Sequence, residues 1–168
     1  MLTAEDVIRL LHLQAHPVEG GFFRETYRSA ETIPASGLPQ HNAARSAGTA
    51  IYYLLKPGAV SEMHVLPGAE VFHFYLGTPI RMLQLWPDGT GKEVTLGPDL
   101  AAGHVPQLVV PGGVWQGSRM VADEGFALLG ATMAPGFDYS DYMTGKRVEL
   151  CAKWPAFARQ IEGLTPKG

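Results

Sequence analysis

Residues 58–77, GAVSEMHVLPGAEVFHFYLG, decide the fold. This stretch contains two short apolar segments, SEMHVL and EVFHFYL, and the pair Pro67-Gly68 separates them. Short apolar runs bounded by proline and glycine are typical of β-strands joined by turns. The stretch therefore predicts two strands connected by a short loop. Strand alternation places His73 on the opposite face from Glu70, so we expect a structural role for His73.

The same pattern continues on both sides of this stretch. From Thr49 onward the other short apolar runs are TAIYYLL, IRMLQLW, KEVTL, PQLVV, VWQGSRMV and GFALLGATM, and turn sequences rich in glycine and proline separate nearly all of them. Eight strands with almost no helical pattern between them favour a closed barrel or jelly roll over alternating βαβ units. We therefore predict a mostly-β fold that forms a single domain over residues 1–168.

Helices are expected only at the two ends of the chain. Thr3 is a helix-capping residue with Asp6 three positions later, and apolar residues follow at helical spacing, which predicts a helix over residues 4–13. Residues 154–161 predict a short closing helix. Residues 30–47 lack periodicity and are rich in Ala, Ser, Pro and Gly, so we expect a surface loop that borders the site.

Composition and charge exclude several classes of protein. The formal net charge is −3 and no basic run exists, so we expect no nucleic-acid partner. The longest uncharged run, residues 100–118, contains prolines and glycines that disfavour a membrane-spanning helix. The start MLTAED and the lone Cys151, to which we assign no role, favour a reducing cytoplasm. High apolar content (46%) and low charge (17%) favour a buried interface and a homodimer.

Residues 58–77 also match a known motif. After Gly58 come five residues, His64, then Leu66, three residues, Glu70, six residues and Gly77. This is the spacing of the first cupin motif, in which Leu66 replaces the second histidine. The second cupin motif is expected after one intervening hairpin, and VPGGVWQG at 110–117 lies there, with Gln116 in place of its histidine. The chain therefore resembles the cupins, which implies a double-stranded β-helix, or jelly-roll barrel, around a cavity.

The flanking sequences resemble one uncharacterised cupin family more closely, family five, formerly a domain of unknown function. The resemblance rests on HPVEGGFFRETYRS (16–29), TAIYYLLKPG (49–58), AEVFHFYLG (69–77), VPQLVVPGGVWQG (105–117) and GATMAPGFDYSDY (130–142). It implies a homodimer of small barrels with open cavities.

A weaker similarity runs to the nucleotide-sugar 3,5-epimerases. GGFFRETY at 20–27 lacks only the arginine of their corresponding segment, and His64 matches the position of their base. Their Lys and Asp partners have no evident counterpart.

The resemblance to cupins raises the question of a metal. Two histidines and one carboxylate would suit iron, manganese or nickel. This chain offers His64, Glu70 and Gln116, and a neutral amide is a poorer donor than imidazole. We therefore expect no firmly bound metal, with a weakly bound divalent ion on these three residues as the alternative.

The candidate catalytic residues are His64, Glu70 and a tyrosine. Histidine titrates near neutral pH, and a carboxylate on its other nitrogen fixes the tautomer and raises the basicity. We therefore expect His64 to act as a base, Glu70 to orient it, and Tyr53 or Tyr27 to donate a proton. The expected substrate-binding residues are Glu25, Tyr27, Phe72, Phe74, Trp115 and Gln116. We expect Trp115 and Gln116 to point into the cavity near His64.

The expected function is that of an epimerase- or isomerase-type enzyme, which acts by proton transfer on a small polar metabolite in the barrel cavity. Two alternatives stay open. One is a non-catalytic binding or sensing module, in which His64 and Glu70 are a hydrogen-bonded pair left from a metal-binding ancestor. The other is a metal-dependent oxygenase or isomerase.

Overall fold

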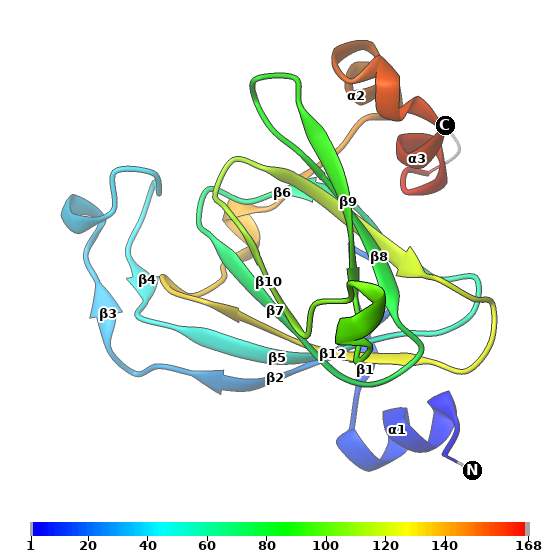
Figure 1. Cartoon of the computed structure of the whole chain (residues 1–168). Coiled ribbons are helices and arrows are strands. Elements are labelled where there is room, and N and C mark those ends of the chain that lie inside the picture. Colours follow the sequence, from blue (N-terminus) through cyan, green and yellow to red (C-terminus); the bar gives the residue numbers. More distant parts are fainter. Residues whose placement is uncertain (1, 167–168) are drawn as a thin grey trace.

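The computed structural model describes residues 2–166, which form two facing antiparallel sheets (Figure 1). The larger sheet has the order β1 (Gln14–Ala15), β2 (Phe22–Arg28), β5 (Thr49–Leu55), β12 (Ala127–Met133), β7 (Glu70–Gly77) and β10 (Gln107–Val110). The smaller has the order β13 (Met143–Thr144), β6 (Val60–Val65), β11 (Trp115–Met120), β8 (Ile80–Leu85) and β9 (Gly91–Leu96). The predicted mostly-β jelly roll is confirmed, and each of the eight runs after Thr49 forms a strand.

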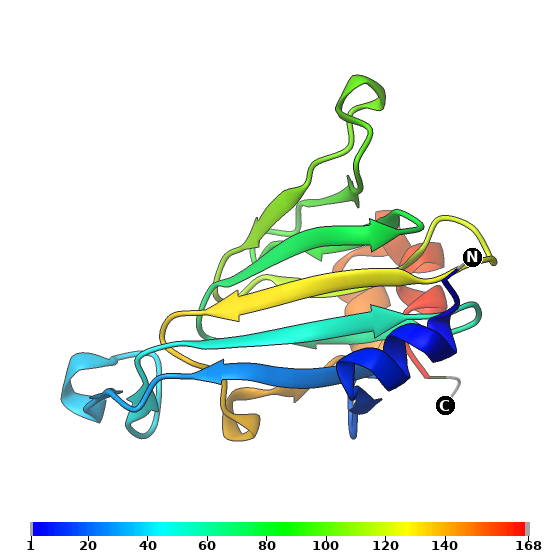
Figure 2. The same ribbon diagram turned by 90° about the horizontal axis from the view of Figure 1, so that it is seen from below.

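The N-terminal helix α1 (Ala4–Leu11) lies outside the larger sheet (Figure 2). The Thr3 side chain accepts the backbone N–H of Asp6 and the Asp6 side chain bonds back to Thr3, which satisfies free amides of the first turn. Val7 packs against Leu54 and Leu128 of the sheet. The helix ends two residues before the predicted Leu13, because His12 adopts a left-handed conformation.

The closing segment differs from the single helix predicted over residues 154–161. It contains α2 (Arg147–Lys153), a 3₁₀ turn (Pro155–Phe157) and α3 (Ala158–Gly163). Trp154 takes an extended-like ψ of 65° because the following proline disfavours helical geometry at that residue. The two helices cover the outer face of the smaller sheet, where Leu150 and Ile161 pack against Leu83 and Leu85.

The predicted loop at 30–47 contains some regular structure. The short strands β3 (Thr32–Ile33) and β4 (Arg45–Ser46) pair with each other, and a 3₁₀ turn (Ala35–Gly37) lies between them. Figure 2 shows this hairpin projecting beyond the ends of β2 and β5. Within residues 2–166 no helix is long and apolar enough to span a membrane.

The main apolar core fills the space between the two sheets. Tyr53, Leu55, Phe72, Ile80 and Leu129 are among its fully enclosed side chains. A cavity adjoins this core, and Phe23, Ile51 and Ala131 border both.

Candidate active site

The cavity inside the barrel has a volume of about 70 Å³. Its walls come from β2, β5, β6, β7 and β12, from residues 16–19 before β2, and from residues 137–142 after β12. Polar and titratable side chains from these segments meet apolar ones from the sheets. A cavity of this composition is suited to a small polar ligand or to one group of a larger ligand.

His64 lies on β6 and is only 1% exposed. Its Nδ1 is 2.7 Å from the backbone carbonyl oxygen of Glu62. Because a carbonyl oxygen can only accept, Nδ1 carries the hydrogen in the neutral ring, and Nε2 keeps its lone pair. The backbone thus fixes the tautomer that a general base requires. The expectation that Glu70 orients His64 is wrong, since the Glu62 carbonyl holds that nitrogen.

Glu70 instead bonds to Gln116, whose Nε2 donates to Glu70 Oε2 across 2.8 Å. Gln116 on β11 pairs directly with His64 on β6, so the two cupin-like motifs meet as their spacing predicts. Burial, followed by the nearby Glu19, raises the pKa of Glu70 to about 8, and the bond from Gln116 opposes this shift. Glu70 is therefore mainly a neutral acid at pH 7.

These three residues do not fit a tightly held metal ion. Within residues 2–166 no group of three His, Cys, Asp or Glu side chains is arranged to hold one. The amide nitrogen of Gln116 is bound to Glu70, and its Oε1 is buried without a hydrogen-bond partner among the described residues. One imidazole, one carboxyl and one amide form a weaker donor set for a divalent transition metal than two imidazoles and a carboxylate.

A second histidine, His16, also lines the cavity. Its Nδ1 accepts the backbone N–H of Glu19 at 2.9 Å, so Nε2 carries the hydrogen. Burial lowers the pKa of His16, the neighbouring Glu19 opposes this, and His64 lowers it further. The two backbone contacts therefore set opposite tautomers in the neutral rings, His64 with an accepting Nε2 and His16 with a donating Nε2.

Tyr142 contributes the third functional group. Its ring stacks on that of His64 with centroids 4.7 Å apart. Its hydroxyl is buried and has no hydrogen-bond partner within residues 2–166. Burial, with a further contribution from Glu19, raises the pKa of this phenol and keeps it protonated. Tyr142 thus places an unpartnered hydroxyl group on a ring that stacks on His64.

Residues 41 and 45 hold the segment that carries Tyr142. Arg45 on β4 donates from Nε to Asp141 Oδ2 at 2.8 Å and from Nη2 to Oδ1, and His41 Nδ1 lies 2.9 Å from Oδ2. The backbone N–H of Phe137 donates to Thr49 Oγ1 at 2.9 Å. The predicted loop at 30–47 therefore contacts the site indirectly, by fixing the 137–142 segment.

Glu25 and Arg28 lie on the cavity wall as a half-exposed ion pair, with Arg28 Nη2 2.7 Å from Glu25 Oε2. A bulge between Glu25 and Tyr27 shifts the register of β2 against β5. The bulge brings Arg28 to the cavity, while Tyr27 is 57% exposed and does not line it. The expectation that Tyr27 contacts ligand is therefore corrected.

Four other expected site residues lie away from the cavity, and Gln116 does not line it either but bonds to Glu70, which does. Tyr53 is enclosed in the core and donates its hydroxyl to the carbonyl of Gly20 at 2.9 Å, so it is not available as a proton donor. Phe72 belongs to the same core and Phe74 packs against it. Trp115 packs with the C-terminal helices on the outer face of the smaller sheet. Alternation predicts the face of a strand but not the position along the barrel that a residue occupies.

His73 lies on the face opposite Glu70, as predicted. Its Nε2 is 3.0 Å from Thr132 Oγ1, and it stacks with Tyr75. It does not line the cavity.

Sequence reasoning did not identify His16, Glu19, Arg28, Tyr139 or Tyr142 as site residues, although they line the cavity. Most of these residues lie in connecting segments without periodicity. The available signal was their presence in the family-like stretches 16–29 and 130–142.

Comparison with known proteins identifies the family. A family model described as "Cupin superfamily (DUF985)" matches residues 5–144. An uncharacterized protein of Saccharomyces cerevisiae is 34% identical over 134 residues, which cover 74% of this chain and 66% of that protein. The chain thus spans just under two thirds of that relative's length.

Solved structures agree with this assignment. A protein from Shewanella oneidensis is 35% identical, with a TM-score of 0.89 and complete coverage of both chains. A hypothetical protein from Leishmania major is 29% identical, with a TM-score of 0.88 over 99% of this chain and 100% of that one. An oxalate decarboxylase of Bacillus subtilis (18% identity, TM-score 0.54, 99% of this chain and 39% of that one) shares the fold. The chain belongs to the cupin superfamily, in the family described as DUF985.

Proposed function

We propose that this cupin binds a small polar metabolite in the barrel cavity and isomerises or epimerises it by proton transfer. The hydrogen bond between His64 Nδ1 and the Glu62 carbonyl carries the proposal, because in the neutral ring it leaves Nε2 of this buried histidine free to accept a proton. The similarity of residues 20–27 and His64 to the nucleotide-sugar 3,5-epimerases supports the same chemistry, and it rests on these residues alone.

The proposed step is an enolisation. His64 Nε2 removes a proton from the carbon next to a carbonyl group, and the C–H electron pair forms the C=C bond of an enolate. The Tyr142 hydroxyl, whose raised pKa keeps it protonated, donates a hydrogen bond to the enolate oxygen and stabilises its charge. Return of the proton from His64 to carbon yields an isomer of the substrate. The step balances without an oxidant or a second reactant.

The surroundings suit this step. His16 donates from Nε2 to an oxygen of the substrate and so orients it. The mainly neutral Glu70 adds no full negative charge next to the base at pH 7. Phe23, Ile51 and Met133 form apolar parts of the wall, which limits water near the enolate.

Specific observations favour two alternatives. Leu66 and Gln116 replace two ligands of the cupin motifs, which is consistent with a binding or sensing protein without turnover. The convergence of His64, Glu70 and Gln116 would suit a weak divalent ion. One solved oxalate decarboxylase is described by its Mn(II) centres, but at 15% identity the likeness to this chain extends to the fold.

We also propose that the protein is a cytoplasmic homodimer. The lone Cys151 is a free thiol, as a reducing compartment favours. Tyr75 on β7 and Val109 on β10 are each about half exposed on the larger sheet, and a second copy would cover such side chains.

Proton exchange tests the proposed function directly. Purified protein is incubated in D₂O with a panel of reducing sugars, sugar phosphates and hydroxy or keto acids, and ¹H NMR follows the signal next to each carbonyl. Wild type should catalyse the loss of this signal for at least one compound, and His64→Ala should not. Saturable binding without exchange supports the binding module. If exchange requires stoichiometric metal found by elemental analysis, the metal-dependent alternative holds.

A further inference from the structure

Arg81 and Arg119 form an unusual pair on the outer face of the smaller sheet. The register of β8 and β11 sets the two residues directly opposite each other. Side chains opposed in this way start about 5 Å apart, and like charges there destabilise a sheet. Thr95 on β9 and Val60 on β6 continue the same row, and neither carries a compensating negative charge.

Neither arginine has a partner within residues 2–166, and this separates the pair from the other cations. Among the other described lysines and arginines, only Arg159 also lacks one. Carboxylates are the partners of Arg9, Arg28, Arg45, Lys56 and Lys146. A backbone carbonyl accepts from Arg147, and aromatic rings lie under Arg24, Lys92 and Lys153. Two unpaired arginines at directly opposed strand positions are thus exceptional in a chain of net charge −3.

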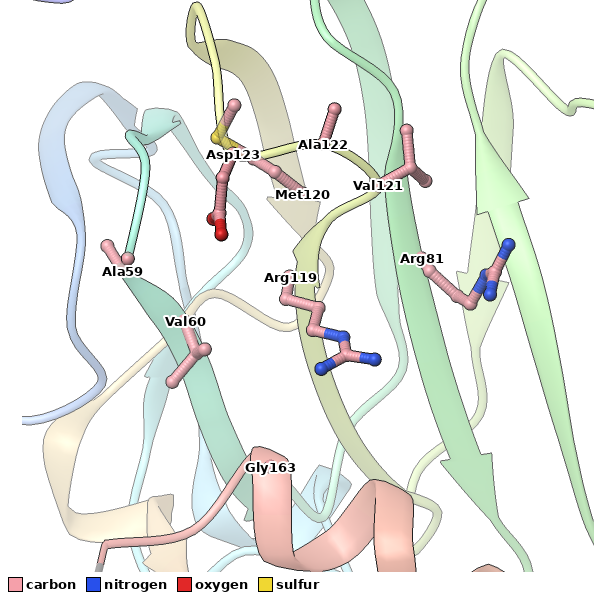
Figure 3. A pocket seen from close by; sticks show the side chains of 10 residues that line it. Ala59, Val60, Arg81, Arg119, Met120, Val121, Ala122, Asp123 and Gly163 are labelled. Atoms are coloured by element: carbon pink, nitrogen blue, oxygen red, sulfur yellow. The ribbon is translucent and has the colours of Figure 1, made fainter.

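The pair lies in a pocket of about 340 Å³, formed by the turn at Gly58, by β6, β8 and β11, by the loop after β11, and by the end of α3 (Figure 3). In the figure the Arg119 side chain extends toward Gly163 of α3, and the Asp123 carboxylate points into the pocket from the loop. This pocket shares no lining residue with the barrel cavity. It is therefore a separate surface site.

We propose that this pocket binds a small hydroxylated phosphate ester. Guanidinium groups bind phosphate oxygens through paired N–H donors, and the two arginines that line this one pocket match the charge of a phosphate dianion. Bound phosphate would also remove the repulsion between Arg81 and Arg119. Asp123 lies across the same pocket and accepts a hydrogen bond from a hydroxyl group of the ester. A nucleic-acid backbone is disfavoured because the pocket offers only these two cations.

Calorimetric titration with ribose 5-phosphate, inorganic phosphate and ribose at low ionic strength tests the site. Wild type should bind ribose 5-phosphate saturably and more tightly than phosphate, with little binding of ribose. Arg119→Ala and Arg81→Gln should each weaken ribose 5-phosphate at least ~10-fold. Affinity should fall as salt is raised, because the site is exposed.

Three variants separate this site from nonspecific attraction and from the barrel cavity. Arg159→Ala removes an unpaired arginine outside the pocket and should leave binding unchanged. His64→Ala alters the cavity and should leave it unchanged as well. Asp123→Asn should weaken the binding of ribose 5-phosphate relative to that of inorganic phosphate. The sugar hydroxyl loses a carboxylate acceptor, whereas removal of the negative charge favours both ligands.

Folding of the variants is checked by thermal melts without ligand. Arg119→Ala and Arg81→Gln should melt close to the wild-type temperature, since both side chains are exposed and neither has a partner within the described residues. Absence of saturable binding in wild type overturns the proposal, as does an equal loss in Arg159→Ala. Binding that depends on His64 instead assigns the ligand to the barrel cavity, and tighter binding of RNA than of ribose 5-phosphate assigns a different partner.

Discussion

The rings of His64 and Tyr142 lie nearly parallel, inclined by 19° with centroids 4.7 Å apart. Each ring is held from outside the stack, His64 by the Glu62 carbonyl and Tyr142 by its neighbour Asp141, which is bound to Arg45. The proposed base and the proposed hydrogen-bond donor are thus positioned by separate contacts. Substitutions can therefore remove one without displacing the other.

His64→Ala should lose function far more than stability. The substitution removes one hydrogen bond and one stacking contact, so we expect about 1–2 kcal/mol of destabilisation. The rate of hydrogen–deuterium exchange at the substrate carbon should fall at least ~100-fold if His64 is the base. His73→Ala, a histidine on the outer face, is the matched control and should retain activity. A normal exchange rate in His64→Ala would assign the base elsewhere.

Tyr142→Phe should slow the reaction without unfolding the protein. The phenol hydroxyl is buried without a partner among the described residues, so its removal should leave the melting temperature equal or slightly higher. The turnover rate should fall ~10²- to 10³-fold with a small change in KM, because a hydrogen bond that stabilises the enolate is lost. Tyr75→Phe on the outer face serves as the control. An unchanged turnover rate would show that Tyr142 only covers His64.

Glu70 should make stability depend on pH in a defined direction. Its pKa is about 8 in the folded protein and near the ordinary 4.5 when unfolded, so the folded state binds the proton more tightly between these values. Stability should therefore fall as pH rises from about 4.5 to about 8. Glu70→Gln should abolish this part of the slope and be roughly 1–3 kcal/mol more stable than wild type near pH 8.5.

Chemical denaturation at several pH values measures this effect. Glu149→Gln, an exposed residue on α2, controls for the change in net charge. Parallel pH profiles for wild type and Glu70→Gln would show that Glu70 is already ionised in the folded protein.

Asp141→Asn should both destabilise the protein and impair the site. The Arg45 side chain is enclosed but keeps its bonds to the Ala44 carbonyl and Ser140 Oγ, so loss of its carboxylate partner should cost about 1–3 kcal/mol. Arg45 also holds the pKa of Asp141 below its usual range. The stability that this ion pair gives wild type should therefore be lost as pH falls. Under conditions where the variant is folded, its KM should rise because Tyr142 is less well placed. Asp138→Asn, which removes an exposed charge but keeps an acceptor for the backbone N–H of Ser140, should have a much smaller effect on both quantities.

Light scattering at micromolar concentration should give the mass of a dimer. Val109 is half exposed on the outer face of the larger sheet. Val109→Asp should shift the protein toward the monomer, because a dimer interface on this face would have to bury the new charge. Val148→Asp, at an 80% exposed position on α2, is the control. A monomeric wild type would contradict the homodimer.

The sequence predicted the parts of this protein that follow from periodicity and spacing. His64 and Gln116 meet across β6 and β11 because two motifs at fixed separation fix the register of a barrel. The face of Tyr27 was not predictable, since a bulge inside β2 reverses the alternation there. Tyr142 was also missed because its position depends on the Arg45–Asp141 contact between segments 96 residues apart. No local pattern encodes such a contact.

The cavity walls have a consequence for protein synthesis. His16 precedes β2, His64 lies on β6, and Tyr142 follows β12. A nascent chain that has exposed only its first half contains both histidines but lacks the tyrosine and the strand that joins β5 to β7. The proposed base therefore cannot meet its hydrogen-bond donor until residue 142 has left the ribosome.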